Sequence, residues 1–181
     1  TDMTSLFHGA DVFNQDVNNW NTSNVVTMTL TFGGAGDFNK PLNNWNTSNV
    51  VTMEKMFQNA GQFNQPLNNW NVSNVINMSD MFNSAILFNQ PLNNWDVSNV
   101  KSMQGMFDYA NLFNGDISSW NVSNVTDMYR MFQGPTLFNQ DISTKEVTRD
   151  DGTSYIAWDV SNVTNMNYMF KYAESFNQPL N

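Results

Sequence analysis

Tryptophan recurs at a fixed interval of 25 residues along most of this 181-residue chain. Five copies keep this interval: Trp20, Trp45, Trp70, Trp95 and Trp120. The sixth copy, Trp158, comes 38 residues later, which is one interval plus 13 inserted residues. A Ser-Asn-Val motif follows each tryptophan at the same offset. An interval of this size indicates a solenoid, whose coils pack only against their neighbours.

The other large apolar residues keep the same register. All 14 Phe fall in two columns and all 12 Met in two more. A single unit cannot bury so many large side chains, so we expect stacked units to close them into one core. Because each Phe column has seven members, we predict a single solenoid domain of seven coils over residues 1–181. Both ends of the sequence fall within a repeat, so we interpret the chain as a piece of a longer protein.

Each unit divides into two halves with different spacing. In one half, Met78, Met81, Phe82, Ala85 and Phe88 have the spacing of one face of an amphipathic helix. A good N-cap residue precedes the leading Met in every unit. In the other half, Leu67-x-x-Trp70-x-Val72 alternates as a short strand does. These patterns predict an α/β repeat, with short parallel strands on one face of the solenoid and short helices on the other.

The unit Phe-Asn-Gln-Pro-Leu-Asn-Asn-Trp-Asn-Val-Ser-Asn-Val-Ile-Asn-Met-Ser-Asp-Met-Phe at residues 63–82 resembles a known repeat. It is similar to the 25-residue repeat of BspA-like bacterial surface proteins, and to the mycoplasma-type lipoprotein repeat of unknown function. This resemblance implies a leucine-rich-repeat-like solenoid, an extracellular or cell-surface location, and adhesion or contact with host proteins. It implies no catalytic residues. The inserted residues before Trp158 depart from the pattern of the family.

Charge and residue content exclude several kinds of chemistry. The net charge of -9 repels phosphate backbones, so we expect no nucleic-acid partner. Without cysteine, and with His8 as the single histidine, the chain lacks the residues of a zinc site or a Cys-His pair. No apolar stretch approaches the roughly 18 residues of a membrane span. We therefore predict no enzymatic activity and no cofactor. Calcium binding by the glycine-rich segment 33–37 stays open as the weaker alternative to an ordinary turn.

The insertion at residues 144–157 is the first candidate for a binding surface. Two short runs, residues 146–149 and 153–156, flank Asp150-Asp151-Gly152, which predicts a β-hairpin with a glycine-containing turn. Arg149, Asp150, Asp151 and Tyr155 are its candidate contact residues. Insertions in repeat proteins often carry the binding side, but a tolerated surface loop explains the same residues equally well.

Five residues of the C-terminal half form a second candidate. Tyrosine is the one aromatic residue type that lies outside the core columns, and tyrosine together with arginine is typical of protein interfaces. The candidate contact residues are Tyr109, Tyr129, Arg130, Tyr168 and Tyr172.

A polar column next to the tryptophans is the third candidate. Its members are Asn21, Asn46, Asn71, Asp96, Asn121 and Asp159. They either form a stabilising ladder of stacked amides along the predicted sheet, or present a flat polar surface to protein or glycan.

Together these features favour a non-enzymatic interaction module that is secreted or displayed at the cell surface, with a protein or glycan as its partner. A structural stalk or spacer without a ligand of its own is the alternative. Because solenoid ends expose unpaired backbone groups, end-to-end self-association is a further expectation.

Overall fold

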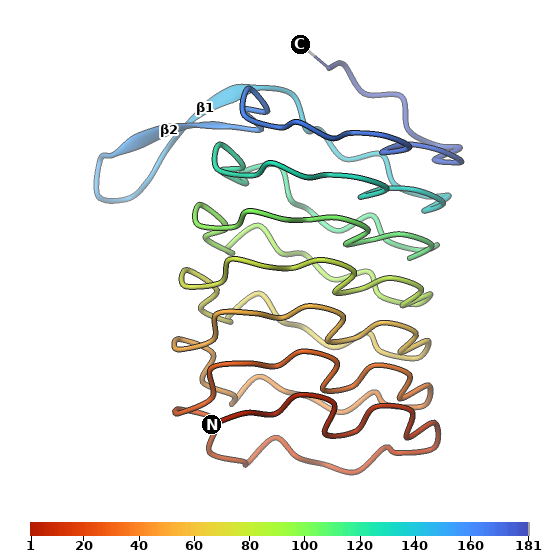
Figure 1. Cartoon of the computed structure of the whole chain (residues 1–181). Helices are drawn as coiled ribbons and strands as arrows, with labels where there is room; N and C mark the ends of the chain where they lie inside the picture. Colours follow the sequence, from red (N-terminus) through yellow and green to blue (C-terminus); the bar gives the residue numbers. More distant parts are fainter. Residues whose placement is uncertain (181) are drawn as a thin grey trace.

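The computed structural model describes residues 1–180 as a column of stacked coils (Figure 1). These residues contain no α-helix, and their two β-strands are β1 (Lys145–Thr148) and β2 (Ser154–Ala157). The predicted leucine-rich-repeat-like α/β class, with helices on one face and parallel strands on the other, is therefore wrong. The chain folds as a non-helical, solenoid-like repeat of turns.

The segment predicted to be helical is a ribbon of consecutive turns, as the third coil shows. The amides of Met56 and Gln58 donate to carbonyls three residues earlier, those of Met53 and Lys55. Lys55 and Asn59 adopt the left-handed conformation, with φ of 56° and 58°. Left-handed residues cannot continue a right-handed helix, and each stands at the third position of a turn, as in type II turns. The spacing misled the prediction because the turns also point their apolar side chains to one side.

The intervening amides of this ribbon bond to the next coil. The amides of Lys55 and Phe57 donate to the carbonyls of Ser79 and Met81 at 2.9 Å. The predicted N-cap residues have a different role, because they form the parallel bridges between coils. The bridged residues are Asp2, Thr27, Thr52, Asn77, Ser102, Asp127 and Asn165. The predicted strand at Trp70–Val72 is absent, since this segment turns instead, with the Trp70 amide donating to Leu67.

Aromatic ladders fill the core. Phe57 stacks on Phe63 of its own coil at 4.0 Å and on Phe82 of the next coil at 5.6 Å. Trp45 and Trp70 stack at 6.4 Å with an interplanar angle of 2°. Such stacked rings contribute beyond the area that they bury. The repeat therefore encodes continuous stacks of aromatic rings along the axis.

Polar side chains connect the coils at two more columns. The Oδ1 atom of Asn64 accepts the amide of Asn89 at 3.0 Å. The Nδ2 atom of Asn74, in the Ser-Asn-Val motif, donates to the carbonyl of Ser48 at 2.7 Å. These bonds explain why the columns contain asparagine, whose amide satisfies backbone groups that turns leave unpaired.

The insertion folds as an antiparallel hairpin that projects from the side of the stack (Figure 1). Lys145 pairs with Ala157 at its base, so the chain leaves and re-enters the coil at one place. The amide of Trp158 then bonds to the carbonyl of Trp120, in the coil below. Among the described residues, no helix is long and apolar enough to cross a membrane.

Candidate functional site

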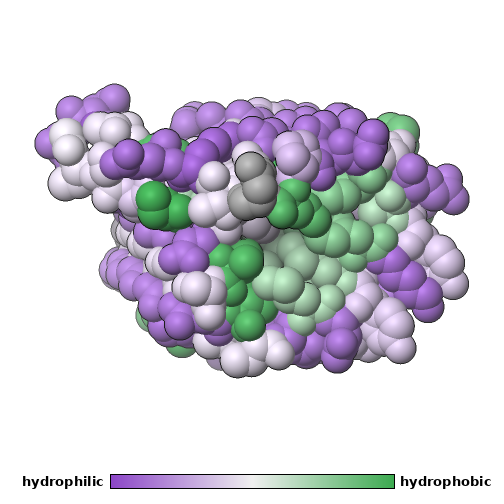
Figure 2. All heavy atoms as spheres, turned by 90° about the horizontal axis from the view of Figure 1, so that it is seen from above, coloured by the Kyte–Doolittle hydropathy of each residue, from purple (hydrophilic) through white to green (hydrophobic). Residues whose placement is uncertain are grey.

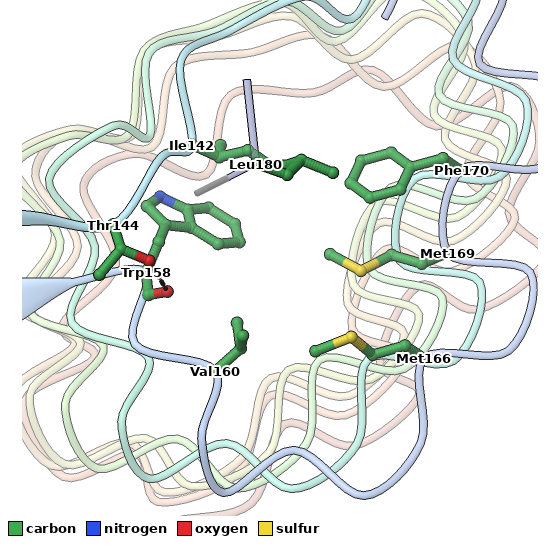
Figure 3. A pocket seen from close by; sticks show the side chains of 8 residues that line it. All are labelled: Ile142, Thr144, Trp158, Val160, Met166, Met169, Phe170 and Leu180. Carbon is green, nitrogen blue, oxygen red and sulfur yellow. Dashed lines mark hydrogen bonds between the residues drawn. The ribbon is translucent and has the colours of Figure 1, made fainter. Parts of the chain in front are cut away.

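The predicted contact residues fall into two groups on different sides of the solenoid. Figure 3 shows Met166, Met169 and Phe170 across a hollow from Thr144 and Trp158. The hairpin starts after Thr144 and ends before Trp158, so it lies on the side of these two residues. Tyr168 and Tyr172 lie on the side of Met166, Met169 and Phe170. The structure thus separates the tyrosine candidates from the hairpin candidates.

We call the first group the tyrosine patch: Tyr109, Tyr129, Arg130, Tyr168, Lys171 and Tyr172. The guanidinium of Arg130 lies 4.7 Å from the ring centroid of Tyr129 and 5.9 Å from that of Tyr168. The two rings meet edge to face at 6.0 Å. Lys171 lies 5.1 Å from the ring of Tyr168 and 4.8 Å from that of Tyr172. Aromatic and cationic groups therefore form one connected surface.

The turn ribbon presents these side chains outward. Tyr168 and Tyr172 are 55% and 60% exposed. Tyr109, Arg130, Tyr168 and Tyr172 all have positive φ, between 54° and 62°. The same two positions are left-handed in every coil, so this conformation belongs to the turn ribbon as a whole and places the side chains of the patch on its outer side.

Gly134 makes room for one of the rings. Its φ is 85°, and a Cβ atom placed there would lie 2.7 Å from Cδ1 of Tyr109. Any larger residue at this position would push the ring of Tyr109 away. Glycine therefore lets the Tyr109 ring lie along the next coil.

A buried acid lies beside the patch. Asp108 is 5% exposed, and its Oδ1 atom has no hydrogen-bond partner. Burial raises the pKa of Asp108 to about 6, against the opposing effect of the Arg130 guanidinium. The Nε atom of Arg130 is also buried without a partner. Gln133, which stands at the same position of the next coil, is also buried at 5% exposure.

The second group lies where the hairpin leans over the coils. Arg149 stacks over the ring of Tyr155 at 4.3 Å, and the Tyr155 hydroxyl donates to the carbonyl of Ser119. These side chains enclose, with Asp96 and Asn121, a polar hollow of about 110 Å³. We call it the hairpin hollow. The fold thereby brings two hairpin candidates together with two members of the polar column.

The acidic tip of the hairpin has a different role. Oδ1 of Asp151 accepts the amide and the hydroxyl of Thr153, at 2.9 and 2.7 Å. These bonds lower the pKa of Asp151. Asp150 and Asp151 are exposed and do not line the hollow. Their place is the turn, which Gly152 completes with a φ of 84°.

The polar column does not form the predicted amide ladder, because no sheet is present there. Each Oδ1 atom instead accepts the amide two residues later in its own coil, as Asn71 does from Ser73 at 3.0 Å. This arrangement recurs at Asn21, Asn46, Asp96, Asn121 and Asp159. The side chains are thus turn caps, and Asp serves as well as Asn because only an acceptor oxygen is needed.

Sequence reasoning missed Lys171 and Asp108. Both belong to the column of His8, in which Gly33, Gln58 and Asn83 also stand. The available signal was their position directly beside Tyr172 and Tyr109 in the chain.

Comparison with protein families gives a match along the whole chain. One family model matches three times, over residues 1–90, 66–155 and 152–181, as expected for a repeat. Comparisons with curated proteins and with solved structures gave no match. The chain belongs to the family described as "Mycoplasma protein of unknown function, DUF285".

Proposed function

We propose that this chain is a non-enzymatic interaction module, secreted or displayed at the cell surface, that contacts a partner protein through the tyrosine patch. The observation that carries the proposal is the connected set of tyrosines and cations on the last coils, of which Tyr168, Lys171 and Tyr172 are exposed. Tyrosine and arginine are the residues that most often dominate binding energy at interfaces. The resemblance of the repeat to BspA-like surface proteins supports adhesion, or contact with host proteins, as the biological setting.

The chemistry of the patch favours a partner with acidic or aromatic groups. The chain has a net charge of -9 and seven Lys and Arg residues in all, and two of these seven lie in the patch. Arg130 and Lys171 therefore give this surface a local positive character within an acidic molecule. Complementary charge on the partner would fix orientation and speed association.

A spacer is the second candidate, and the aromatic ladders favour it. Phenylalanine rings stack from Phe7 to Phe170, which makes the column a continuous packed rod. In this case the surface would have no ligand of its own.

A binding screen against extracellular-matrix proteins and a glycan array separates these proposals. The first variant is the triple substitution Tyr129→Ala, Arg130→Ala and Tyr168→Ala. Its control replaces Ile76 and Ile86, two similarly exposed apolar residues of an earlier coil, with alanine. The second variant lacks residues 145–157, which restores the Leu-x-x-Trp spacing between Ile142 and Trp158.

Each outcome assigns the function differently. We expect binding to fall by roughly tenfold or more in the triple variant and to persist in its control. Loss only in the hairpin deletion would move the function to the hairpin hollow. No binding by the parent protein would contradict the proposal and favour the spacer.

A further inference from the structure

The hairpin hollow is a small polar cavity whose lining includes unpaired hydrogen-bonding groups. Its volume is about 110 Å³, and it lies between the inserted hairpin and two neighbouring coils. Figure 2 shows the hairpin at the left, projecting beyond the outline of the coils with mostly hydrophilic and neutral residues. A cavity of about 150 Å³ encloses benzene. The hollow therefore has room for one edge of a six-membered ring, and the rest of a ligand would stay in solvent.

Arg149 brings a positive charge to the hollow from the hairpin. Its guanidinium lies 4.3 Å from the ring centroid of Tyr155, whose hydroxyl donates to the carbonyl of Ser119. These contacts hold the guanidinium beside the coils. Within residues 1–180 it forms no ion pair, and it donates no hydrogen bond to another side chain or to the backbone. The donors of Arg149 are therefore free for a ligand.

Two side chains of the polar column line the hollow, and each has one free polar atom. Oδ1 of Asp96 accepts the amide of Ser98 at 3.1 Å, and Oδ1 of Asn121 accepts the amide of Ser123 at 3.2 Å. The second polar atoms, Oδ2 of Asp96 and Nδ2 of Asn121, have no hydrogen-bond partner among the described residues. Because the turn fixes one atom of each side chain, the other atom is held in place as well.

This set of groups limits the chemistry of a ligand. Asp96 would repel an anion and Arg149 would repel a cation, so the two charges together favour a neutral ligand. The ligand must accept hydrogen bonds from Arg149 and Asn121 and donate one to Asp96. A hydroxyl group both donates and accepts, and adjacent hydroxyls on one ring do so within a small space. A neutral sugar meets these requirements.

We propose that the hairpin hollow is a binding site for a neutral sugar residue of a glycan. Two adjacent hydroxyls of the sugar enter the hollow, where one donates to Oδ2 of Asp96 and both accept from Arg149 and Asn121. The rest of the glycan lies outside the hollow. This site is separate from the tyrosine patch, and it does not depend on the function proposed for that patch.

A peptide fits the hollow less well. Its backbone presents one donor and one acceptor per residue, and in an extended chain successive residues are about 3.3 Å apart. A hollow of about 110 Å³ holds few of these groups at once. Adjacent hydroxyls of a sugar bring the same number of donors and acceptors into less space.

The test exchanges Asp and Asn in the polar column, because the repeat shows that either residue folds at this position. Asp96→Asn turns the free acceptor into a donor, and Asn121→Asp turns the free donor into an acceptor. Both variants keep the oxygen that caps the turn. The same exchanges outside the hollow, Asp159→Asn and Asn21→Asp, are the matched controls.

A third variant removes the cation. Arg149→Ala deletes the free donors of the hairpin, and Glu146→Ala is its control, since Glu146 is an exposed residue of β1 that does not line the hollow. The probes are an array of neutral oligosaccharides that end in glucose, galactose, mannose or N-acetylglucosamine, and a second array that ends in uronic or sialic acids. Isothermal titration with the neutral oligosaccharide that binds most strongly then gives the affinities.

We expect the parent protein to bind neutral oligosaccharides. The affinity should fall by about tenfold or more in Asp96→Asn, Asn121→Asp and Arg149→Ala, and it should stay unchanged in the three controls. Binding to neither array, or to the acidic array alone, would overturn the proposal. Equal losses in the variants and their controls would overturn it as well, and so would a polypeptide partner that depends on Asp96 and Arg149 when no oligosaccharide does.

Discussion

The indole N–H of Trp120 donates to the carbonyl oxygen of Leu92 at 2.9 Å, and both groups are buried between two coils. The carbonyl belongs to a turn, so the bond ties the turn of one coil to the ring of the next. Four other tryptophans make the same bond.

Replacing Trp120 with phenylalanine should destabilise the protein by about 0.5 to 1.5 kcal/mol through the lost hydrogen bond, because the carbonyl of Leu92 then keeps the amide of Trp95 as its single donor. Urea unfolding, followed by circular dichroism, measures the change. Trp20→Phe is the control, since Trp20 is 44% exposed and its indole N–H has no hydrogen-bond partner among the described residues. Equal losses in both variants would show that ring size, and not the hydrogen bond, sets the effect.

Because some residues of the turns are left-handed, we expect a substitution by glycine at one of them to stabilise the protein. At Lys55, with φ of 56°, glycine relieves backbone strain, so Lys55→Gly should raise the free energy of unfolding by up to about 1 kcal/mol. Both side chains of the ion pair between Lys55 and Glu54 are 35% exposed, so this pair contributes little.

Gln58→Gly is the matched control, because Gln58 lies in the same ribbon without a positive φ. There glycine should cost roughly 0.5 to 1 kcal/mol. If this segment were helical, both substitutions would destabilise. Similar losses at the two positions would therefore contradict the turn ribbon.

These turns also explain how much of the fold could be predicted from the sequence. The 25-residue interval correctly indicated stacked coils and a core of Phe, Met and Trp, because these depend only on which residues recur. The backbone conformation could not be read in this way. Met53, Met56, Phe57 and Ala60 face inward both in a helix and in a ribbon of turns. The φ values of Lys55 and Asn59, together with the amide bonds to the next coil, separate the two, and neither lysine nor asparagine requires the left-handed region.

The candidate sites could be predicted from the sequence only in part. Tyr129, Arg130 and Tyr168 could be grouped because the interval fixes which residues are neighbours in adjacent coils. The contact of Tyr155 with Ser119 depends on the angle at which the hairpin leaves the coil, which the repeat does not encode.

Stability should depend on pH through Asp108. Its pKa is about 6 in the folded state and near 3.8 in the unfolded chain, so the folded state binds the proton more tightly. The free energy of unfolding should therefore fall as the pH rises from about 4 to 6, by about 1 to 3 kcal/mol, and stay level above that.

The Asp108→Asn variant should lose this dependence and should be more stable than the parent at pH 7. Urea unfolding at pH 4.5, 5.5 and 7 measures both. Asp141 and Asp159 have lowered pKa values because of bonds from Ser143 and Ser161, so their contribution is lost only below pH 4. A slope between pH 4.5 and 6 that is unchanged in the variant would contradict the assignment to Asp108.

The hairpin should loosen when its one hydroxyl anchor is removed. Tyr155→Phe keeps the ring beneath Arg149 but loses the bond to Ser119. Limited proteolysis at Arg149 should become several-fold faster, because the open hairpin is more populated by about 1 kcal/mol. Ile156→Ala serves for comparison, since Ile156 is 44% exposed on the opposite face of β2. Unchanged cleavage in Tyr155→Phe would mean that stacking alone holds the hairpin.

The turn ribbon has an electrical direction of its own. In each coil, amides such as those of Met53, Lys55, Phe57 and Asn59 all donate toward the following coil. Peptide dipoles that point the same way add together. The amides that follow the Ser-Asn-Val motif point the other way, since those of Val51, Ile76 and Lys101 donate to the carbonyls of Val26, Val51 and Ile76 in the preceding coil. Each coil therefore carries two opposed rows of peptide dipoles, one along the ribbon and one beside the motif, and their fields oppose each other along the column.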